Sequence, residues 1–454
     1  MKTRDLSRIV KAYDIRGVVP DDFDEPIARD LGAAFARLVA APTVVTAHDM
    51  RETSLPLSRA FAEGVLSQGV DVVEAGLGST DLLYFASGSL DLPGAMFTAS
   101  HNPAQYNGIK LCLAGAVPIG LDSGLLEIGR LAEAGSLQPG PRLGSSRTED
   151  LLSRYAEFLH GLVDLRAGRR LTVVMDAGNG MGGHTVPAVL ADLPLTVIPM
   201  YFELDGSFPN HEANPLDPAN LVDVQAKVRE VGADVGLAFD GDADRCFVID
   251  EAGKPVSPSA ITALVAVREL RKHPGGVVIH NLITSRAVPE IIAEHGGRPV
   301  RTRVGHSYIK DEMARTNAIF GGEHSAHYYF RDFWRAETGM LAAMHLLAAL
   351  GEQLRPLSEL ADEYERYAGS GEINSTVDDP LGSTAAVEKS FAKRAGAVID
   401  RLDGLTMSFP DGSWFNLRAS NTEPLLRLNV EGAERTTMEQ LRDEVLEVIR
   451  GRTI

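Results

Sequence analysis

Short apolar runs alternate along the chain with stretches whose apolar residues follow helical spacing. Three of these runs, residues 171–175, 234–239 and 277–280, end beside Gly, Asp or Asn. Runs of this length that stop at turn-forming residues are typical of buried strands, and their alternation with helices is typical of α/β sheets. Ligands of such sheets bind in the loops beyond the strand ends. The pattern therefore predicts an α/β fold with its functional residues in those loops.

The N-terminal region follows this alternation, whereas the C-terminal region departs from it. Near the N-terminus, Asp24 and Pro26 are suited to cap and start a helix. Towards the C-terminus we expect a helix over residues 385–402, short strands within 406–430 and a closing helix near 437–450. This order predicts a smaller α+β domain at the C-terminal end.

The length of the chain predicts several domains, because 454 residues exceed one typical hydrophobic core. Polar passages rich in Gly and Pro near residues 135–150, 251–259 and 369–371 indicate the boundaries. We therefore expect four segments, three α/β and the last α+β, over residues 1–150, 151–254, 255–368 and 369–454.

Charge and composition exclude several classes of partner. The net charge is −18, from 44 Lys and Arg against 62 Asp and Glu, and it repels nucleic acid and anionic membranes. Cys112 and Cys246 form neither a disulfide framework nor a zinc site, and residues 1–20 lack an apolar signal segment. Residues 340–350 are apolar but too few to span a bilayer, and they predict a buried helix. We expect a cytoplasmic protein.

Residues 98–110 combine a candidate nucleophile and a cation in the sequence Thr-Ala-Ser-His-Asn-Pro-Ala-Gln-Tyr-Asn-Gly-Ile-Lys. Asn107 and Gly108 favour a hairpin turn, with a second strand running from residue 109 to 113. Lys110 would then return toward Ser100 and stabilise the charge of a phosphoryl group on the serine. The alternatives are a capping or turn serine and a serine hydrolase. A hydrolase is disfavoured because no serine lies in a G-x-S-x-G elbow.

Residues 240–245 read Asp-Gly-Asp-Ala-Asp-Arg directly after a predicted strand. The small residues allow Asp240, Asp242 and Asp244 to converge on one divalent ion, most naturally Mg²⁺ completed by a phosphate oxygen. Arg245 can bind the same phosphate. An EF-hand would place Glu251 at its twelfth position, but it requires Gly where Arg245 stands and a helix where we expect a strand. A solvated acidic turn remains the structural alternative.

Residues 178–183 match the G-x-G-x-x-G pattern of dinucleotide-binding turns, and the acidic Glu203 follows. An isolated match of this kind is a weak signal. We interpret the segment as a tight strand-to-helix turn, and a NAD-dependent dehydrogenase remains an alternative.

Two further loops carry polar groups suited to a phosphosugar. Residues 321–327 contain Glu323, which can accept two sugar hydroxyls, and His327, which can move a proton near neutral pH. Residues 418–424 read Arg-Ala-Ser-Asn-Thr-Glu-Pro and can donate several hydrogen bonds to phosphate. The first loop also contains His324 and Ser325, and the second offers Arg418, Ser420, Asn421 and Thr422.

Taken in order, these loops resemble the α-D-phosphohexomutase family, and within it the bacterial phosphomannomutase/phosphoglucomutase branch. The resemblance extends over nearly the whole chain. It rests on the Lys-Ala-Tyr-Asp-Ile-Arg-Gly segment at residues 11–17, on Val-Gly-His at residues 304–306, and on residues 98–110, 240–245, 323–327 and 418–424.

This resemblance implies four domains around a central cleft, with three similar mixed α/β domains and a smaller C-terminal α+β domain. It implies that Ser100 is phosphorylated and that Mg²⁺ is held by Asp240, Asp242, Asp244 and a phosphoserine oxygen. The phosphoryl group would pass to a hexose phosphate and give a hexose 1,6-bisphosphate, which is the intermediate and also the activator. The bisphosphate would turn end for end before it returns a phosphate to Ser100.

The resemblance also implies roles for the remaining residues. Lys110, Arg16 and Arg245 would neutralise the transferring phosphoryl group, and His306, His327 or Lys110 would relay the hydroxyl proton. The substrate-binding residues would be Tyr13, Arg245, Glu323, Ser325, Arg418, Ser420, Asn421 and Thr422.

The choice of sugar depends on two positions of the sugar loop. A glucosamine-specific branch of the same family usually has Gln where His324 stands and Gly where Ala326 stands. These differences favour mannose and glucose phosphates as substrates.

The chain departs from the family pattern at residue 337, where many relatives have Asp and this sequence has Glu337. A phosphoglucosamine mutase, a non-catalytic phosphosugar-binding protein and a metal-dependent phosphatase remain alternatives.

Overall fold

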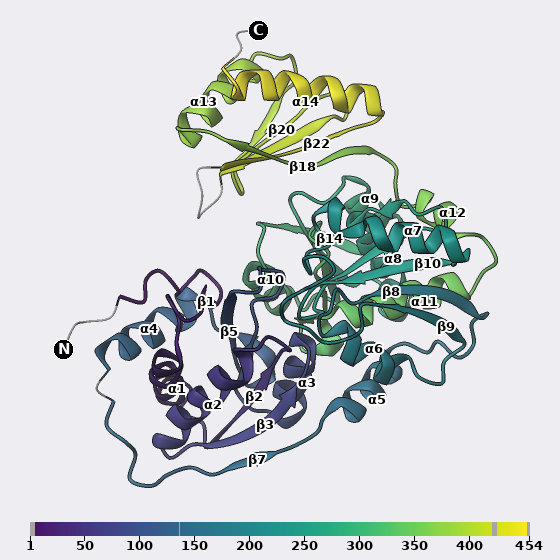
Figure 1. Ribbon diagram of the computed structural model, residues 1–454. Coiled ribbons are helices and arrows are strands. Elements are labelled where there is room, and N and C mark those ends of the chain that lie inside the picture. Colours follow the sequence, from purple (N-terminus) through teal and green to yellow (C-terminus); the bar gives the residue numbers. More distant parts are fainter. Residues whose placement is uncertain (1–4, 136, 420–424, 452–454) are drawn as a thin grey trace. The chain divides into compact units, whose positions relative to one another are not determined.

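The computed structural model describes residues 5–135, 137–419 and 425–451. They form two compact units (Figure 1). One unit comprises Met1–Val256, Met313–Phe320 and Ser325–Leu360, and the other comprises Ser257–Glu312, Gly321–His324 and Ala361–Ile454.

The first sheet is mixed, with parallel strands in its centre and antiparallel strands at one side. Asp24 caps the first helix by accepting a hydrogen bond from the amide of Ile27, as the sequence predicts. Phe35, Phe61 and Phe97 pack the first two helices on the sheet, with ring centroids 5.4–5.6 Å apart. The strand order is β1 (Ile15–Val18), β5 (Tyr106–Leu113), β4 (Gly94–Phe97), β2 (Thr43–His48), β3 (Asp71–Leu77) and β7 (Ser146–Thr148), with β6 (Val117–Pro118) beside β5. The helices are α1 (Glu25–Val39), α2 (Ser54–Ser67), α3 (Thr80–Leu90) and α4 (Leu125–Ala134), with short 3-10 turns η1 (Ala114–Ala116) and η2 (Leu121–Ser123).

The second sheet has three parallel strands, β10, β8 and β9, and continues on the other side of β10 with two antiparallel pairings, through β11 to β12. Its central strand β10 is buried along its whole length and leads directly into the acidic segment at residue 240. The strand order is β12 (Pro255–Val256), β11 (Cys246–Ile249), β10 (Val235–Phe239), β8 (Leu171–Asp176) and β9 (Leu195–Met200). The accompanying helices are α5 (Leu152–Leu162), α6 (Gly182–Leu190) and α7 (Val222–Val231), with η3 (Pro218–Leu221).

The third sheet combines a parallel pair, β13 with β14, and an antiparallel pair, β16 with β17. Its strand order is β14 (Arg298–Thr302), β13 (Val277–Asn281), β15 (Phe320–Gly322), β16 (Tyr328–Phe330) and β17 (Ala336–Glu337). Its helices are α8 (Pro258–Lys272), α9 (Ala287–Glu294), α10 (His306–Thr316), α11 (Gly339–Gly351) and α12 (Leu357–Asp362), with η4 (Arg331–Phe333). Helix α11 is the buried helix expected at residues 340–350, and Thr338 caps it through the amide of Leu341.

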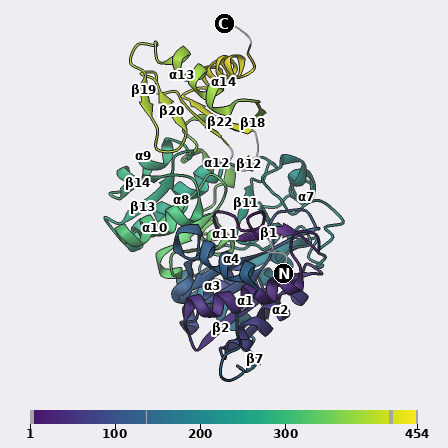
Figure 2. The ribbon, with the colours of Figure 1, turned by 90° about the vertical axis from the view of Figure 1, so that its left-hand side faces the viewer.

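The fourth sheet is antiparallel, and α13 (Pro380–Phe391) and α14 (Arg435–Ile449) cover one of its faces (Figure 2). Its order is β18 (Ala368–Thr376), β22 (Leu425–Gly432), β21 (Trp414–Ala419), β20 (Leu405–Ser408) and β19 (Val398–Asp400). The helix predicted over 385–402 is wrong at both ends. Helix α13 begins earlier because Asp379 caps it ahead of Pro380, and Gly396 adopts a left-handed φ of 74° that precedes a strand.

Across the described ranges, no helix is both long enough and apolar enough to cross a bilayer.

Candidate active site

The loop after β10 brings three carboxylates together. One ligand oxygen from each of Asp240, Asp242 and Asp244 lies within 4.8 Å of the others, and all three side chains are buried. Oδ1 of Asp242 and Oδ1 of Asp244 accept no hydrogen bond from any residue that the structure describes. Buried carboxylate oxygens without donors are costly unless a cation neutralises them. The cluster can therefore hold a divalent metal ion, as its sequence predicts.

Ser100 directly contacts this cluster. Its Oγ donates a hydrogen bond of 2.8 Å to Oδ2 of Asp240, and Thr98 Oγ1 accepts the Ser100 amide at 2.9 Å. The backbone of Ser100 is left-handed, with φ of 51°, although the residue has a Cβ. Such a conformation persists only where surrounding contacts enforce it, and it recurs at active sites. The meeting of Ser100 with the acidic loop brings together the two strongest motifs of the sequence.

The hairpin turn predicted at Asn107 and Gly108 is wrong. Strand β5 already begins at Tyr106, so both residues lie inside it and pair with Gly17 and Arg16 of β1. A Cβ at Gly108 would lie 2.2 Å from the carbonyl oxygen of Ile15, so close packing of strands, and not a turn, requires glycine there. The connection between β4 and β5 is instead the longer segment 98–105, in which Ser100 supplies the positive φ.

Lys110 and Arg245 place cations on the cluster. Lys110 Nζ donates to Oδ2 of Asp242 at 2.7 Å and to Oδ2 of Asp244 at 2.6 Å. Arg245 donates to Oδ2 of Asp240 at 2.8–2.9 Å and to Ser100 Oγ at 3.3 Å. The return of Lys110 to the serine site, expected from a short hairpin, thus occurs along β5. Arg245 thus places positive charge beside Ser100, and Lys110 places it beside Asp242 and Asp244.

The charges of the cluster depend on one another. Burial raises the pKa of Asp244, and repulsion from Asp242 raises it further. Burial also raises the pKa of Asp242, but Lys110, the hydrogen bond from Thr80 and the charge of Arg245 together hold that pKa below its ordinary value. Burial lowers the pKa of Lys110, whereas Asp242 and Asp244 raise it by more, so Lys110 remains an ammonium at neutral pH. A divalent ion would favour the ionised form of all three carboxylates.

His101 Nδ1 lies 3.3 Å from Ser100 Oγ, but Arg245 engages the same nitrogen. Arg245 donates to His101 Nδ1, and because a guanidinium only donates, that nitrogen must present its lone pair to Arg245. Burial lowers the pKa of His101, and the charge of Arg245 lowers it further. The imidazole is therefore neutral and its Nδ1 is occupied, which argues against a serine hydrolase.

Two other predicted residues lie near the cluster in the same unit. Arg16 donates to Asp14 at 2.5 Å and to Oδ1 of Asn102. Asn102 belongs to residues 98–106, which we call the serine segment. His327 Nε2 is 3.9 Å from Oδ1 of Asp244, and His327 Nδ1 lies 3.0 Å from Ser325 Oγ. Tyr13 is half-buried just before β1.

The remaining described candidates belong to the second unit. Glu323 is buried, and its Oε1 accepts hydrogen bonds from Asn281 Nδ2 at 3.1 Å and from the Gly305 amide at 3.2 Å. His324 Nδ1 lies 2.9 Å from Ser259 Oγ, and burial lowers the pKa of His324. His306 begins helix α10.

Arg418 ends β21 between two carboxylates. It lies 3.5 Å from Glu372 and 3.7 Å from Asp403, and these contacts hold the guanidinium at the start of the predicted phosphate loop. The predicted partners Ser420, Asn421 and Thr422 lie outside the described residues.

The structure adds residues that the sequence analysis missed. Thr80, at the start of α3, donates from Oγ1 to Oδ2 of Asp242 at 2.6 Å, and Arg51 donates to four carbonyl oxygens of the serine segment. Asp49 pairs with Arg51 at 3.3 Å. Their position beyond the end of β2 was the only available signal, since polar residues after a buried strand are candidates for function.

The G-x-G-x-x-G segment contacts the acidic loop. The amide of Met181 donates to the Gly241 carbonyl at 2.9 Å, and a Cβ on Gly180 would lie 2.6 Å from that oxygen. Backbone groups that would face a pyrophosphate in a dinucleotide site instead pack against the loop of Asp240 and Asp242. The tight-turn interpretation fits these contacts, and the dehydrogenase alternative does not.

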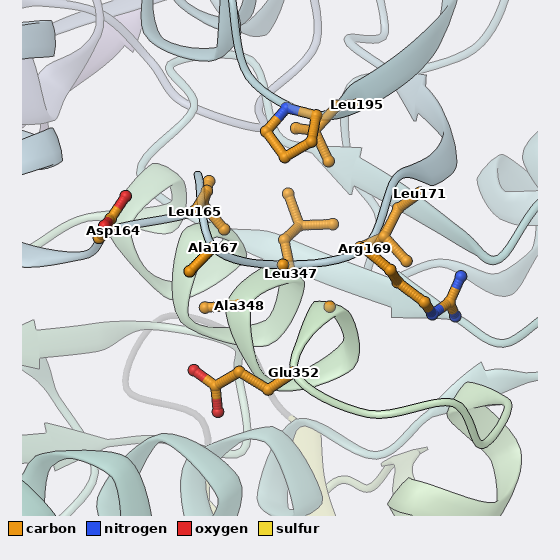
Figure 3. A pocket seen from close by; sticks show the side chains of 12 residues that line it. Asp164, Leu165, Ala167, Arg169, Leu171, Leu195, Leu347, Ala348 and Glu352 are labelled. Atoms are coloured by element: carbon orange, nitrogen blue, oxygen red, sulfur yellow. The ribbon is translucent and has the colours of Figure 1, made fainter.

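A small cavity lies elsewhere in the first unit, between the segment before β8 and the end of α11 (Figure 3). Its volume is about 30 Å³, and its lining includes Asp164, Leu347 and Glu352. That volume accommodates about one water molecule and is far below that of a ligand pocket. None of the lining residues belongs to the predicted site.

Family models cover most of the chain. They describe phosphoglucomutase/phosphomannomutase α/β/α domains I, II and III, which match residues 7–136, 153–253 and 257–367, and the C-terminal domain, which matches residues 372–448. Together with the mixed sheets, these matches confirm the four-domain phosphohexomutase architecture.

Individual proteins agree with the models. A phosphomannomutase of Salmonella typhimurium is 42% identical over 431 residues, which cover 93% of this chain and 94% of that protein. The phosphohexose mutases of Xanthomonas campestris are 38% identical over 445 residues, 97% of this chain and 99% of theirs. The crystal structure of a phosphoglucomutase/phosphomannomutase family protein from Burkholderia thailandensis matches with a TM-score of 0.88 at 31% identity, covering 97% of each chain.

The fold, the site and the relatives thus define a phosphohexomutase, an isomerase that moves a phosphoryl group within a sugar phosphate. The chain belongs to the phosphoglucomutase/phosphomannomutase family, that is, to the α-D-phosphohexomutases.

Proposed function

We propose that the chain is a phosphomannomutase/phosphoglucomutase that interconverts hexose 1-phosphates and hexose 6-phosphates through a phosphoserine at Ser100. The observation that carries the proposal is the 2.8 Å hydrogen bond from Ser100 Oγ to Asp240 in a buried cluster of three carboxylates. A nucleophile adjoining a metal-binding cluster is suited to phosphoryl transfer. The names of the closely similar relatives support the same activity.

In this proposal Asp240, Asp242, Asp244 and a phosphoserine oxygen hold Mg²⁺. The hard oxygen ligands and the two carboxylate oxygens without donors fit this ion. When bound, the ion supplies positive charge to the transferring phosphoryl group. Arg245 and Lys110 add to that charge from the protein side, and Arg16 orients the serine segment through Asn102.

The reaction requires two transfers. In the first, the bond from phosphorus to Ser100 Oγ breaks as phosphorus bonds to the free hydroxyl oxygen of the hexose phosphate. A base takes the hydroxyl proton, and the released Ser100 oxygen takes up a proton to become a hydroxyl again. The product is the hexose 1,6-bisphosphate, which reorients and returns its other phosphate to Ser100. Among His306, His327 and Lys110, the charged Lys110 is the poorest proton acceptor. Because Nε2 of His327 lies 3.9 Å from Asp244, we propose His327 as the base.

For substrate binding, the proposal uses the residues that the sequence predicts. Glu323 and Ser325 would accept sugar hydroxyls in two orientations, with Tyr13 and Arg245 as further contacts. Arg418, Ser420, Asn421 and Thr422 would hold the phosphate that is not reacting. We assign these roles to four domains bounded at residues 1–150, 151–254, 255–368 and 369–454.

Mannose and glucose phosphates are the proposed substrates, and a cytoplasmic enzyme is the proposed setting. The relatives named phosphomannomutase and phosphohexose mutases support this choice, as do His324 and Ala326. An N-acetylphosphoglucosamine mutase of Aspergillus fumigatus, crystallised with glucose 1,6-bisphosphate, shares 14% identity and therefore supports the fold alone. Phosphoglucosamine mutase is the alternative activity.

The test is conversion of mannose 1-phosphate, glucose 1-phosphate and glucosamine 1-phosphate to their 6-phosphates with Mg²⁺, with and without a hexose 1,6-bisphosphate. We expect bisphosphate-stimulated isomerisation, fastest with mannose or glucose. Preference for glucosamine would establish the alternative activity. Release of inorganic phosphate without isomerisation would indicate a phosphatase, and binding without either reaction would indicate a phosphosugar-binding protein.

A further inference from the structure

The side chain of Arg51 donates four hydrogen bonds to backbone carbonyls of the serine segment. Its NH2 group donates to the carbonyl oxygens of Ser100 at 2.9 Å and Asn102 at 2.7 Å. Its NH1 group donates to the carbonyl oxygens of Pro103 at 2.9 Å and Tyr106 at 3.0 Å. One buried guanidinium thus satisfies three carbonyls of the irregular connection between β4 and β5 and the carbonyl of Tyr106, the first residue of β5.

The guanidinium is itself held on two sides. Asp49 Oδ2 lies 3.3 Å from Nε of Arg51, and the amide of Asp49 is anchored to the Phe97 carbonyl of β4. On the other side, the Phe208 ring covers the guanidinium with its centroid 5.0 Å away. The backbone near Phe208 also packs closely against the backbone of Arg51, because a Cβ on Gly206 would lie 2.6 Å from Arg51 Cα. The side chain of Arg51 is 1% exposed.

These contacts bear on the orientation of the nucleophile. The left-handed conformation of Ser100 is unfavourable for a residue with a Cβ, so its neighbours must enforce it. The bond from Arg51 fixes the carbonyl of Ser100, and Thr98 fixes its amide. With both peptide groups held, Oγ is directed at Asp240.

We propose that Arg51 is a positioning residue for phosphoryl transfer, which fixes the Ser100 backbone so that Oγ adjoins the carboxylate cluster. The inference rests on the proposed function, because it assigns Arg51 to the transfer step at Ser100. It also separates two steps of that function. The Arg51 guanidinium donates to residues 100–106 and pairs with Asp49, and none of these partners is a proposed sugar-binding residue, so sugar binding should be independent of it. A lysine cannot replace the guanidinium, since one ammonium lacks the planar set of donors that reaches four carbonyls.

The test compares Arg51→Lys with the wild-type full chain by amide hydrogen exchange and by kinetics. Without metal or sugar, we expect faster exchange confined to residues 98–108. With the sugar that the wild type prefers, we expect kcat to fall about 100-fold while KM stays within about threefold, as for a misplaced reacting group. Phosphorylation of Ser100 by a hexose 1,6-bisphosphate should slow by the same factor as kcat.

The control is Val65→Ala, which removes buried side-chain atoms from α2 without touching the serine segment. At a similar Tm, this control should keep wild-type exchange in residues 98–108 and a near wild-type kcat. If Arg51→Lys does not fold, Phe208→Ala is the second variant, since it admits water to the guanidinium and should show the same changes more weakly.

Unchanged exchange in residues 98–108 in the variant that folds would overturn the proposal, and so would a raised KM with unchanged kcat. Loss of kcat to the same extent in Val65→Ala would reduce Arg51 to a general stability role. Exchange does not require turnover, so a wild type without mutase activity would refute the proposed function while the exchange result still decides whether Arg51 orders the segment.

Discussion

Thr80 and Asp242 lie 162 residues apart in the sequence and share two hydrogen bonds. Oγ1 of Thr80 donates to Oδ2 of Asp242 at 2.6 Å, and the Thr80 amide donates to the Asp242 carbonyl at 3.0 Å. The first turn of α3 therefore supports the acidic loop through both backbone and side chain. Residues that orient metal ligands in this way influence metal affinity without touching the ion.

Replacing Thr80 tests that support. Thr80→Val keeps the shape but removes the hydroxyl, and we expect the dissociation constant for Mg²⁺ to rise by roughly 10-fold. Titration calorimetry measures the change directly. Thr80→Ser is the matched control, since it keeps the hydroxyl and should bind the ion nearly as the wild type does. Equal affinity of the valine and serine variants would contradict the prediction.

Ser100→Ala tests the nucleophile. Removing Oγ leaves the carboxylates in place but eliminates the phosphoryl acceptor, so turnover should fall by roughly 10⁴-fold or more while sugar phosphate binding is largely kept. Isomerisation assays and calorimetry with the preferred sugar phosphate measure the two quantities. Intact-protein mass spectrometry should show no phosphorylation by a hexose 1,6-bisphosphate. Ser67→Ala is a matched serine control on α2, and near-normal turnover of Ser100→Ala would refute the phosphoserine.

Gly180→Ala tests the contact between the glycine-rich turn and the acidic loop. The added Cβ would lie 2.6 Å from the Gly241 carbonyl, which forces one of the two loops to move. We expect a loss of about 1–3 kcal/mol in the free energy of unfolding, together with weaker Mg²⁺ binding. Gly161→Ala on α5 is the control, because its Cβ meets nothing within 4 Å. Wild-type stability and metal affinity in Gly180→Ala would show that the turn is not tightly packed.

Asp81 predicts a pH dependence of stability. It is buried and accepts hydrogen bonds from Tyr155 and Thr338, each at 2.7 Å, yet burial raises its pKa from 3.8 to about 6. The folded state binds the Asp81 proton more tightly than the unfolded state does, so protonation of Asp81 stabilises the fold. This stabilisation is complete below about pH 3.8 and is lost as the pH rises through about 6. The loss amounts to about 3 kcal/mol.

Urea unfolding of the wild type and of Asp81→Asn, from pH 4 to pH 7, measures this effect. The wild type should lose stability relative to the variant as the pH rises, and subtracting the two curves removes groups that titrate in both proteins. A difference that is constant over this range would contradict the raised pKa.

Motifs in the sequence were sufficient to predict the family and to select residues that the structure brings together. Ser100 and the Asp residues at 240, 242 and 244 stand in short segments whose residue types already indicate a nucleophile and metal ligands, and the structure brings them together. The hairpin at Asn107 was wrong because the same dipeptide occurs inside a strand where a neighbouring backbone approaches closely. Local sequence does not record such an approach.

Arg51 and Thr80 were missed for a related reason. Their partners lie about 50 and 162 residues away, and neither residue stands in a recognisable motif. Helix α13 was misplaced because apolar spacing alone did not reveal that Asp379 caps it early and that the chain turns at Gly396. The fold class followed from periodicity, whereas the supporting contacts depend on tertiary structure.

Gly241 lies where the glycine-rich turn, the acidic loop and the serine segment meet. A Cβ on it would come within 2.4 Å of the Ser100 carbonyl oxygen. The two loops therefore behave as a single part in any attempt to redesign this enzyme. Grafting the acidic loop onto another scaffold would fail unless the serine segment is transferred with it, because the two segments pack backbone to backbone at Gly241. A directed-evolution library should keep position 241 fixed and place its diversity elsewhere.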